Sequence, residues 1–367
     1  MLNNAYISLL IIDGALDLSS ASYLMQRLDQ GHPLKTLEAE AKVIKQFYQF
    51  CHSQNIHPAS RFSHLNRLTT GEIESLTAFY SVRKDTGEIV ASGTFKLRWT
   101  VTRKFIKFLW DFYQSRVTSH DLLKAAQIQL GGMEKAFIIH GKTPYRSTNK
   151  DKVGLSPELR AEFLDIINPV KENTQNPWKG EIVRWRNYCL FLTMILGGNR
   201  KGESLGLQLN HFNLVGPSNS RKYFEIIKVD QLTSGYPRKE IPSVKTNGRQ
   251  VELSDDFAAI FEHYITKIRP KFKNATKSTY VFLSLRDGHP LSVITPNESL
   301  KTLIKKHPQF EKLLTPHILR NTFHDLLSEK LDSTLDAHGP IAKQGIKTTL
   351  QEYAGGWSPG SSMVHKY

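Results

Sequence analysis

Apolar side chains recur at helical spacing through much of the first 140 residues. The pattern begins at Thr36 and predicts a helix whose apolar face holds Val43, Ile44, Phe47, Tyr48 and Cys51. Further helices are predicted over residues 70–83, 94–113 and 121–137. Residues 1–35 fit no clear period, and we expect a small arm or an extra strand there. The pattern therefore predicts a helical domain over residues 36–140.

The predicted helix over residues 94–113 has the strongest pattern in this half of the chain. Its apolar side chains fall on one stripe, formed by Leu97, Val101, Phe105, Phe108, Leu109 and Phe112. Basic side chains are interleaved with that stripe, and several should face away from the core: Lys96, Arg98, Arg103, Lys104 and Lys107.

A polar, basic stretch over residues 141–154 predicts an interdomain linker, and residues 155–367 then form a second domain. This domain opens with Ser156, Pro157 and Glu158, which supply an N-cap, a proline at the first helical position and a first-turn acid. Residues 185–196 are apolar nearly all round and predict a buried central helix, which Gly197-Gly198-Asn199 ends.

Strand signals follow in the second domain. Residues 222–229 alternate like a strand, and residues 244–253 predict a hairpin with Asn247-Gly248 at a type I′ turn. More helices are predicted over residues 255–269 and 297–305, and another one opens at Pro316. The whole pattern predicts a mainly α fold with a small antiparallel β-sheet, arranged in two domains.

Charge changes this picture. The chain has 49 Lys plus Arg against 34 Asp plus Glu, which gives a formal net charge of +15. Such an excess indicates a polyanionic partner, most often nucleic acid, with a membrane surface as the weaker alternative. The basic residues of the 94–113 helix are therefore either a solvated face or candidate DNA contacts.

The two cysteines and the N-terminus indicate the compartment. Cys51 and Cys189 each lie in an apolar helical pattern, which indicates reduced core residues and not a disulfide or zinc site. The apolar first 18 residues lack a basic region and carry Asp13 and Asp17, so they predict neither a signal peptide nor a membrane span. We expect a cytoplasmic protein, nucleoid-associated if it is bacterial.

Several residues could bind an anion. His317 and Arg320 are three residues apart, which places both on one face near a helix start, a natural site for an anion. Arg200 follows a Gly-Gly turn and has Glu203 three residues later. Lys245 lies beside the predicted hairpin turn, and Tyr367 ends the chain after Gly355-Gly356-Trp357.

In this order, these residues resemble the catalytic domain of the tyrosine recombinases, the phage integrase family. The likeness covers residues 36–367, with a helical core-binding domain followed by the catalytic domain. It implies a site-specific DNA recombinase or integrase of mobile genetic elements that breaks and rejoins DNA. Tyr367 would attack a phosphodiester, which leaves a 3′-phosphotyrosine and a free 5′-hydroxyl.

The resemblance also implies a role for each other site residue. Arg200 and Arg320 would pair with the non-bridging phosphate oxygens, where charge gathers in the transition state. His317 would donate a hydrogen bond or handle the tyrosine proton. Lys245 would protonate the leaving 5′-oxygen. Trp357 would donate its indole N–H to a phosphate oxygen or act as a core aromatic residue.

Glu203 is expected to orient Arg200 and not to take part in the chemistry itself. Neither a cofactor nor a metal ion is implied, because the arginines and the lysine supply the positive charge. Lys222, Lys228 and Lys239 remain alternatives to Lys245, and Tyr353 is the rival of Tyr367.

The implied partners are double-stranded DNA recombination sites and further copies of this chain, from dimer to tetramer on DNA. Accessory DNA-bending or directionality factors are further candidate partners. Two alternative functions remain: a type IB topoisomerase, which uses similar residues as a monomer, and a non-catalytic DNA-binding protein on a decayed recombinase scaffold. The separate helical domain favours a recombinase over the first, and the intact set of site residues argues against the second.

The sequence departs from the family pattern at three places. The interval between Arg320 and Tyr367 is long, and residues 333–345, with Gly339-Pro340, are expected to form an inserted loop. Trp357 lies ten residues before Tyr367, one more than is typical. The sequence also ends at the nucleophile, where family members continue into a segment that packs on a neighbour.

Overall fold

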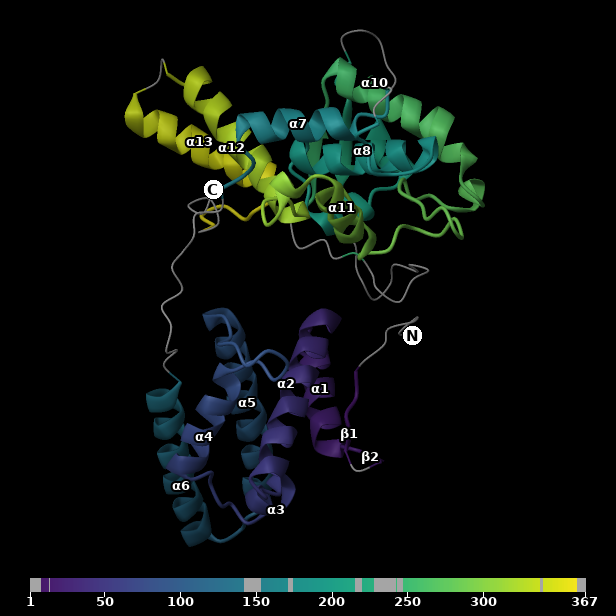
Figure 1. Cartoon of the computed structure of the whole chain (residues 1–367). Coiled ribbons are helices and arrows are strands. Elements are labelled where there is room, and N and C mark those ends of the chain that lie inside the picture. The colour runs from purple at the N-terminus through teal and green to yellow at the C-terminus, as the bar shows by residue number, and fades with distance from the viewer. Residues whose placement is uncertain are drawn as a thin grey trace. The chain divides into compact units, whose positions relative to one another are not determined.

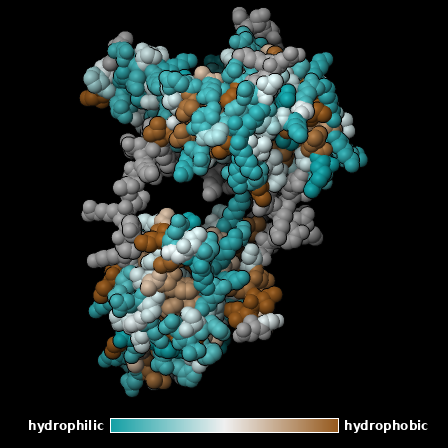
Figure 2. Space-filling view, in the orientation of Figure 1, coloured by the Kyte–Doolittle hydropathy of each residue, from teal (hydrophilic) through white to brown (hydrophobic). Residues whose placement is uncertain are grey.

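The computed structural model describes residues 8–12, 14–141, 153–170, 174–214, 220–227, 242, 247–336 and 339–361. The described residues up to Gly141 form one compact unit, and those from Val153 onward form another. We call these the N-terminal unit and the C-terminal unit, and Figure 1 shows that helices dominate both. The face in Figure 2 is mostly hydrophilic on both units, with separate hydrophobic patches.

The N-terminal unit is a bundle of helices with one small hairpin. Its described elements are β1 (Ile11–Ile12), β2 (Ala15–Leu16), α1 (Leu18–Asp29), α2 (Leu34–Ser53), α3 (Pro58–Ser63), α4 (Thr70–Ser81), α5 (Ser92–Gln114) and α6 (His120–His140). Helices α2, α4, α5 and α6 confirm the four that the sequence predicts. Helix α1 was not predicted: Asp17 caps its start by accepting from the backbone N–H of Ser20, and Tyr23 and Leu24 are buried in the core of the unit.

Helix α5 is the centre of the N-terminal unit, where it packs against α1, α2, α3, α4 and α6. Because neighbours surround it, a broad face is buried, including Phe95, Trp99 and Trp110. The predicted stripe is therefore wrong at both ends. Leu97 is 46% exposed and Phe112 is 44% exposed.

The C-terminal unit combines helices with a small sheet. Its described elements are α7 (Pro157–Ile167), α8 (Glu181–Ile195), α9 (Lys201–Leu205), β3 (Phe212–Asn213), β4 (Tyr223–Ile226), β5 (Arg249–Glu252), α10 (Asp255–His263), α11 (Thr295–Lys306), α12 (Pro316–Thr334) and α13 (Pro340–Gly355), with shorter π- and 3₁₀-helical turns. The predicted N-cap of α7 is confirmed, because the Ser156 hydroxyl accepts from the Leu159 backbone N–H. The predicted helix over residues 255–269 is an α-helix only to His263; a π-helix follows over Tyr264–Ile268.

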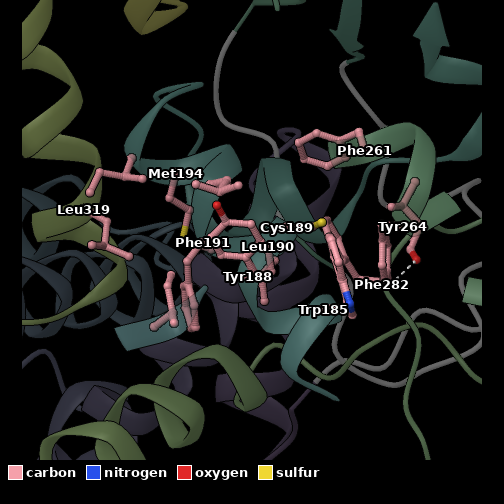
Figure 3. Close-up of a cluster of buried hydrophobic side chains, with 14 of the residues drawn as sticks. Trp185, Tyr188, Cys189, Leu190, Phe191, Met194, Phe261, Tyr264, Phe282 and Leu319 are labelled. Atoms are coloured by element: carbon pink, nitrogen blue, oxygen red, sulfur yellow. Dashed lines mark hydrogen bonds between the residues drawn. The ribbon is translucent and has the colours of Figure 1, made fainter. Parts of the chain in front are cut away.

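Helix α8 is the centre of the C-terminal unit, as predicted. Every residue from Trp185 to Ile195 is buried. Figure 3 shows Cys189, Phe191 and Met194 of this helix among residues of other elements, with Leu319 from α12 and Phe261 from α10. Helix α12, which carries Arg320, packs directly on α8. The buried α8 therefore fixes the position and direction of α12.

The sheet is antiparallel, in the order β3–β4–β5, with Phe224 opposite Val251 and Ile226 opposite Arg249. The predicted type I′ turn is wrong, since a type I′ turn needs positive φ at both central residues and Gly248 lacks it. Strand β5 pairs with β4, and residues 243–246 lie outside the described residues.

The predicted loop over residues 333–345 is also wrong. Helix α12 continues to Thr334, and α13 begins at Pro340, where a proline at the first position favours a helix start. Lysines of α13 tie it to the end of α12, with Lys347 Nζ 2.6 Å from the Asp332 carboxylate and Lys343 Nζ 2.6 Å from Asp336. The two helices thus pack as a pair. No helix among the described residues is both long and apolar enough to cross a membrane.

Candidate active site

The turn after α8 places Arg200. Gly198 has a φ of +64°, and a Cβ there would clash with the Phe323 ring, so both backbone and space require glycine. Arg200 is the N-cap residue of α9. The Glu203 carboxylate accepts from the Arg200 backbone N–H at 2.9 Å and from its Nη1 at 3.1 Å. A local motif therefore fixes both the backbone and the side chain of Arg200.

Glu203 is itself buried and faces three guanidiniums. Its carboxylate lies 3.1 Å from Arg200 Nη1, 2.9 Å from Arg249 Nη2 and 3.8 Å from Arg320 Nη1. Burial raises the pKa of Glu203. The charges of Arg249 and then Arg320, with the hydrogen bond from the Arg200 backbone N–H, lower it by more, so the net pKa is below its ordinary value. Glu203 is thus ionised at neutral pH, and three cations around one anion leave an excess of positive charge.

Arg320 is buried and links three elements. It lies on α12, which Pro316 opens as predicted and whose start the Thr315 hydroxyl caps by accepting from the Ile318 backbone N–H. Its Nη1 donates to the Gly198 carbonyl, and its Nη2 donates to the Gly355 carbonyl at 2.9 Å. Arg200 Nη1 also donates to Gly355, at 3.1 Å. The two arginines predicted to bind phosphate therefore converge at the end of α13.

Trp357 packs beside Arg320. Helix α13 ends where Gly356 takes a left-handed φ of +62°, and the Trp357 backbone N–H then donates to Glu352. The indole ring is buried, and its centroid lies 5.7 Å from the Arg320 guanidinium carbon. It also stacks on the His324 ring, with centroids 5.0 Å apart. Trp357 thus touches the site through its ring face.

His324 and Arg249 belong to the cluster but were missed in the sequence. Burial, followed by the charges of Arg320, Arg200, Arg249 and His317, lowers the pKa of His324 to about 2, so its imidazole is neutral. A signal existed for His324, because it is four residues after Arg320 and shares its helix face. Arg249 gave none beyond its position after Asn247-Gly248.

Of the remaining predicted site residues, some lie in the described part of the chain and others lie outside it. His317 is the second residue of α12 and is exposed, one turn before Arg320. Lys245 and Tyr367 lie outside the described residues, as do Lys228 and Lys239. Asn247, two residues after Lys245, is held at the end of α13, because its backbone N–H donates to the Gly356 carbonyl at 3.2 Å. The alternative Lys222 pairs with Asp255 at 2.9 Å.

The rival tyrosine is engaged elsewhere. The Tyr353 hydroxyl accepts from the backbone N–H of Gln250 at 3.3 Å and donates to the carbonyl of the same residue at 3.4 Å. The phenol oxygen is therefore directed at the edge strand β5.

The candidate DNA contacts on α5 divide into two kinds. Lys96, Arg103, Lys104 and Lys107 are exposed, with Lys107 near Asp111 and Arg103 near Glu134 in surface ion pairs. Arg98 is half-buried and donates to the Tyr80 carbonyl at 2.8 Å and the Val82 carbonyl at 3.3 Å. It therefore joins α5 to the end of α4, and its prediction as a DNA contact loses its support.

No family model matches the chain, and no curated protein does either. Among solved structures, the XerH site-specific recombinase bound to palindromic difH substrate, in its post-cleavage complex, is similar over 97% of this chain and 85% of that chain. The sequence identity is 18% and the TM-score is 0.52. The pre-cleavage XerH complex with difH is similar over 84% of this chain and 93% of that one, at 15% identity and a TM-score of 0.40. At such identities the likeness concerns the fold, and the chain has the fold of the tyrosine recombinases.

Proposed function

We propose that this protein is a site-specific DNA recombinase that cleaves and rejoins DNA strands through a 3′-phosphotyrosine at Tyr367. The observation that carries the proposal is the convergence of Arg200 and Arg320 on the Gly355 carbonyl, around a buried and ionised Glu203. Two guanidiniums held in fixed positions suit the non-bridging oxygens of a phosphodiester. The fold, shared with XerH, supports the same reading.

Each proposed site residue has one role in the reaction. The Tyr367 oxygen bonds to phosphorus and gives up its proton with the help of His317, whose imidazole is exposed one turn before Arg320. The P–O5′ bond breaks, and Lys245 protonates the leaving 5′-oxygen. Arg200 and Arg320 stabilise the charge on the pentacovalent phosphorus. A 5′-hydroxyl from another strand then reverses the step and rejoins the DNA.

Glu203 and Trp357 support these groups. Glu203 fixes Arg200 through its side chain and its backbone N–H. Trp357 packs its ring beside the Arg320 guanidinium, which restricts how that arginine can turn. The indole N–H remains the group we expect to donate to a phosphate oxygen. Neither a metal ion nor another cofactor is needed in this scheme, because the arginines and lysine carry the charge.

The proposed strand-exchange reaction determines which partners the protein needs. The substrate is double-stranded DNA, and exchange between two duplexes requires an assembly of two to four copies of the chain on DNA. Accessory DNA-bending or directionality factors would act on that assembly. The exposed basic residues of α5, with Arg98 excepted, are the proposed DNA contacts of the N-terminal unit.

Covalent capture tests the proposal. Wild-type protein is mixed with a library of random-sequence duplexes that carry a nick, and adducts that survive SDS but not protease are sequenced. We expect enrichment of one defined site, adducts on the 3′ side of the break, and equal yield with EDTA. A metal requirement would contradict the proposed chemistry. Relaxation of supercoiled plasmid without site preference would favour a topoisomerase, and tight DNA binding without any adduct would favour a non-catalytic DNA-binding protein.

A further inference from the structure

Arg249 is a buried arginine whose contacts are unusual for a residue that only packs. It opens β5, and its side chain is 1% exposed. Its Nη2 donates to Glu203 at 2.9 Å and lies 3.5 Å from the Gly198 carbonyl. Its Nε and Nη1 have no hydrogen-bond partner among the described residues. A guanidinium buried with so few partners disfavours the folded state, so stability alone does not explain its presence at this place.

Glu203 connects Arg249 to the groups proposed to bind phosphate. The carboxylate oxygen that accepts from Arg249 also accepts from the Arg200 backbone N–H, and the other oxygen accepts from Arg200 Nη1. The Gly198 carbonyl beside Arg249 accepts from Arg320 Nη1 as well. A change at Arg249 would therefore reach both arginines without any direct contact with DNA.

We propose that Arg249 is a positioning residue of the strand-cleavage reaction, which holds Glu203 as a carboxylate in the one orientation that fixes Arg200. This inference rests on the proposed function for its activity readout. The assignment stands on geometry: β5 is held in the sheet by its pairing with β4, so Arg249 reaches Glu203 from a rigid element.

The charged groups around Glu203 support the assignment. Arg200 faces it from its own turn, Arg249 from β5, and Arg320 from α12. His324, also on α12, is neutral, and the more distant His317 is exposed. On α13 the Glu352 carboxylate is turned to the backbone N–H groups of Gly360 and Ser361. Among the causes that lower the pKa of Glu203, the charge of Arg249 is the largest.

The test compares Arg249→Met with Arg249→Lys and with a matched control, Arg269→Met. Arg269 is also buried, but it donates to the carbonyls of Tyr280 and Ser278 and not to Glu203. On the nicked duplexes that wild-type protein captures, we expect Arg249→Met to form adduct roughly 10²-fold more slowly, as misplaced reacting groups do. DNA affinity should stay within about twofold, because the residue is buried. Arg249→Lys keeps the charge and should recover part of the rate, and Arg269→Met should react as wild type does.

A second measurement needs no DNA. Without Arg249 the pKa of Glu203 should rise, so the stability lost by Arg249→Met relative to wild type should be largest near pH 7 and shrink as the pH falls towards 4. The loss caused by Arg269→Met should stay constant over that range. A constant loss for Arg249→Met, or a wild-type rate of cleavage, would overturn the assignment. If wild-type protein forms no adduct while the pH dependence appears, the proposed function fails and the coupling of Arg249 to Glu203 stands.

Discussion

The two units bury charged groups in opposite ways. In the N-terminal unit, Glu40 pairs with one guanidinium, as Arg27 donates from Nη2 at 3.0 Å and from Nε at 3.2 Å. In the C-terminal unit, Glu203 faces three guanidiniums, those of Arg200, Arg249 and Arg320. In the first arrangement one positive charge meets one negative charge through a bidentate contact, as is typical of a structural ion pair.

The second arrangement has more positive charge than its one carboxylate can offset. Excess buried charge opposes folding, so stability alone does not account for the cluster. An anion that joins the cluster would complete the balance, and a DNA phosphate is the anion that our proposal supplies. The comparison therefore contrasts an ion pair that holds a fold with a cluster that we propose serves a reaction.

The largest expected effect is on cleavage. Arg200→Ala and Arg320→Ala should each slow adduct formation roughly 10³-fold, because each removes a donor to the transition-state charge. Site binding should change little for Arg200→Ala, since its interactions are strongest in the transition state. Adduct yield and DNA affinity are measured on the same captured duplex. A loss of affinity in proportion to the lost rate would mean that these arginines only bind DNA.

The next effect concerns stability and sharpens the comparison between the two carboxylates. Glu203→Gln leaves several buried guanidiniums without their counter-charge and should cost about 3 kcal/mol of unfolding free energy. Glu40→Gln leaves a single arginine, whose side chain is 14% exposed, without its counter-charge and should cost less, roughly 2 kcal/mol. Urea unfolding of the two variants at pH 7 measures both. Equal losses would show that the surplus charge around Glu203 has no energetic consequence.

The stability lost by Glu203→Gln has a pH dependence with a defined sign. Because the pKa of Glu203 is lowered in the folded protein, its ionised form stabilises the fold above the ordinary pKa of a glutamate, about 4.3, and that contribution is lost as the pH falls through the lower folded value. The gap between wild type and Glu203→Gln should therefore close on acidification below pH 4. A gap that persists in acid would contradict the ionised state of Glu203.

The smallest effect is on DNA binding by the N-terminal unit. Replacing the exposed Lys96 and Lys104 by alanine should weaken duplex binding for every sequence and reduce the slope of log affinity against log salt by about two. The matched variant Arg98→Ala should leave that slope unchanged and lower the melting temperature, because its side chain holds two carbonyls at the end of α4. Fluorescence anisotropy over a salt series separates the two. A slope change in Arg98→Ala would restore it as a DNA contact.

Local signals in the sequence predicted much of the fold. Helical periodicity located α2, α4, α5, α6 and α8, the Ser156 cap located the start of α7, and Pro316 located the start of α12. These features depend on neighbours a few residues away. The family-derived expectation of a loop over residues 333–345 was wrong, because Pro340 starts a helix there.

Features that depend on distant contacts were missed. The burial of Trp99 and Trp110 on α5 follows from neighbours on several sides, which a single-stripe pattern does not contain. Arg98 resembles its exposed neighbours in sequence, and only the end of α4 distinguishes it. Arg249 joins the site because β5 lies beside the turn after α8. Arg200, Glu203 and Arg320, in contrast, were singled out by the family resemblance, and the structure brings the three side chains together.

The measurement that tests the central claim most directly is the identity of the residue bonded to DNA. Tyr367→Phe removes one oxygen, and Tyr353→Phe is its matched control, since the Tyr353 hydroxyl is bonded to the backbone of Gln250. On the captured nicked duplex, wild type and Tyr353→Phe should give the SDS-resistant 3′ adduct, and Tyr367→Phe should give none while binding the site with unchanged affinity. Peptide mapping should place the bond on Tyr367. An adduct formed by Tyr367→Phe, or one mapped to Tyr353, would contradict the account.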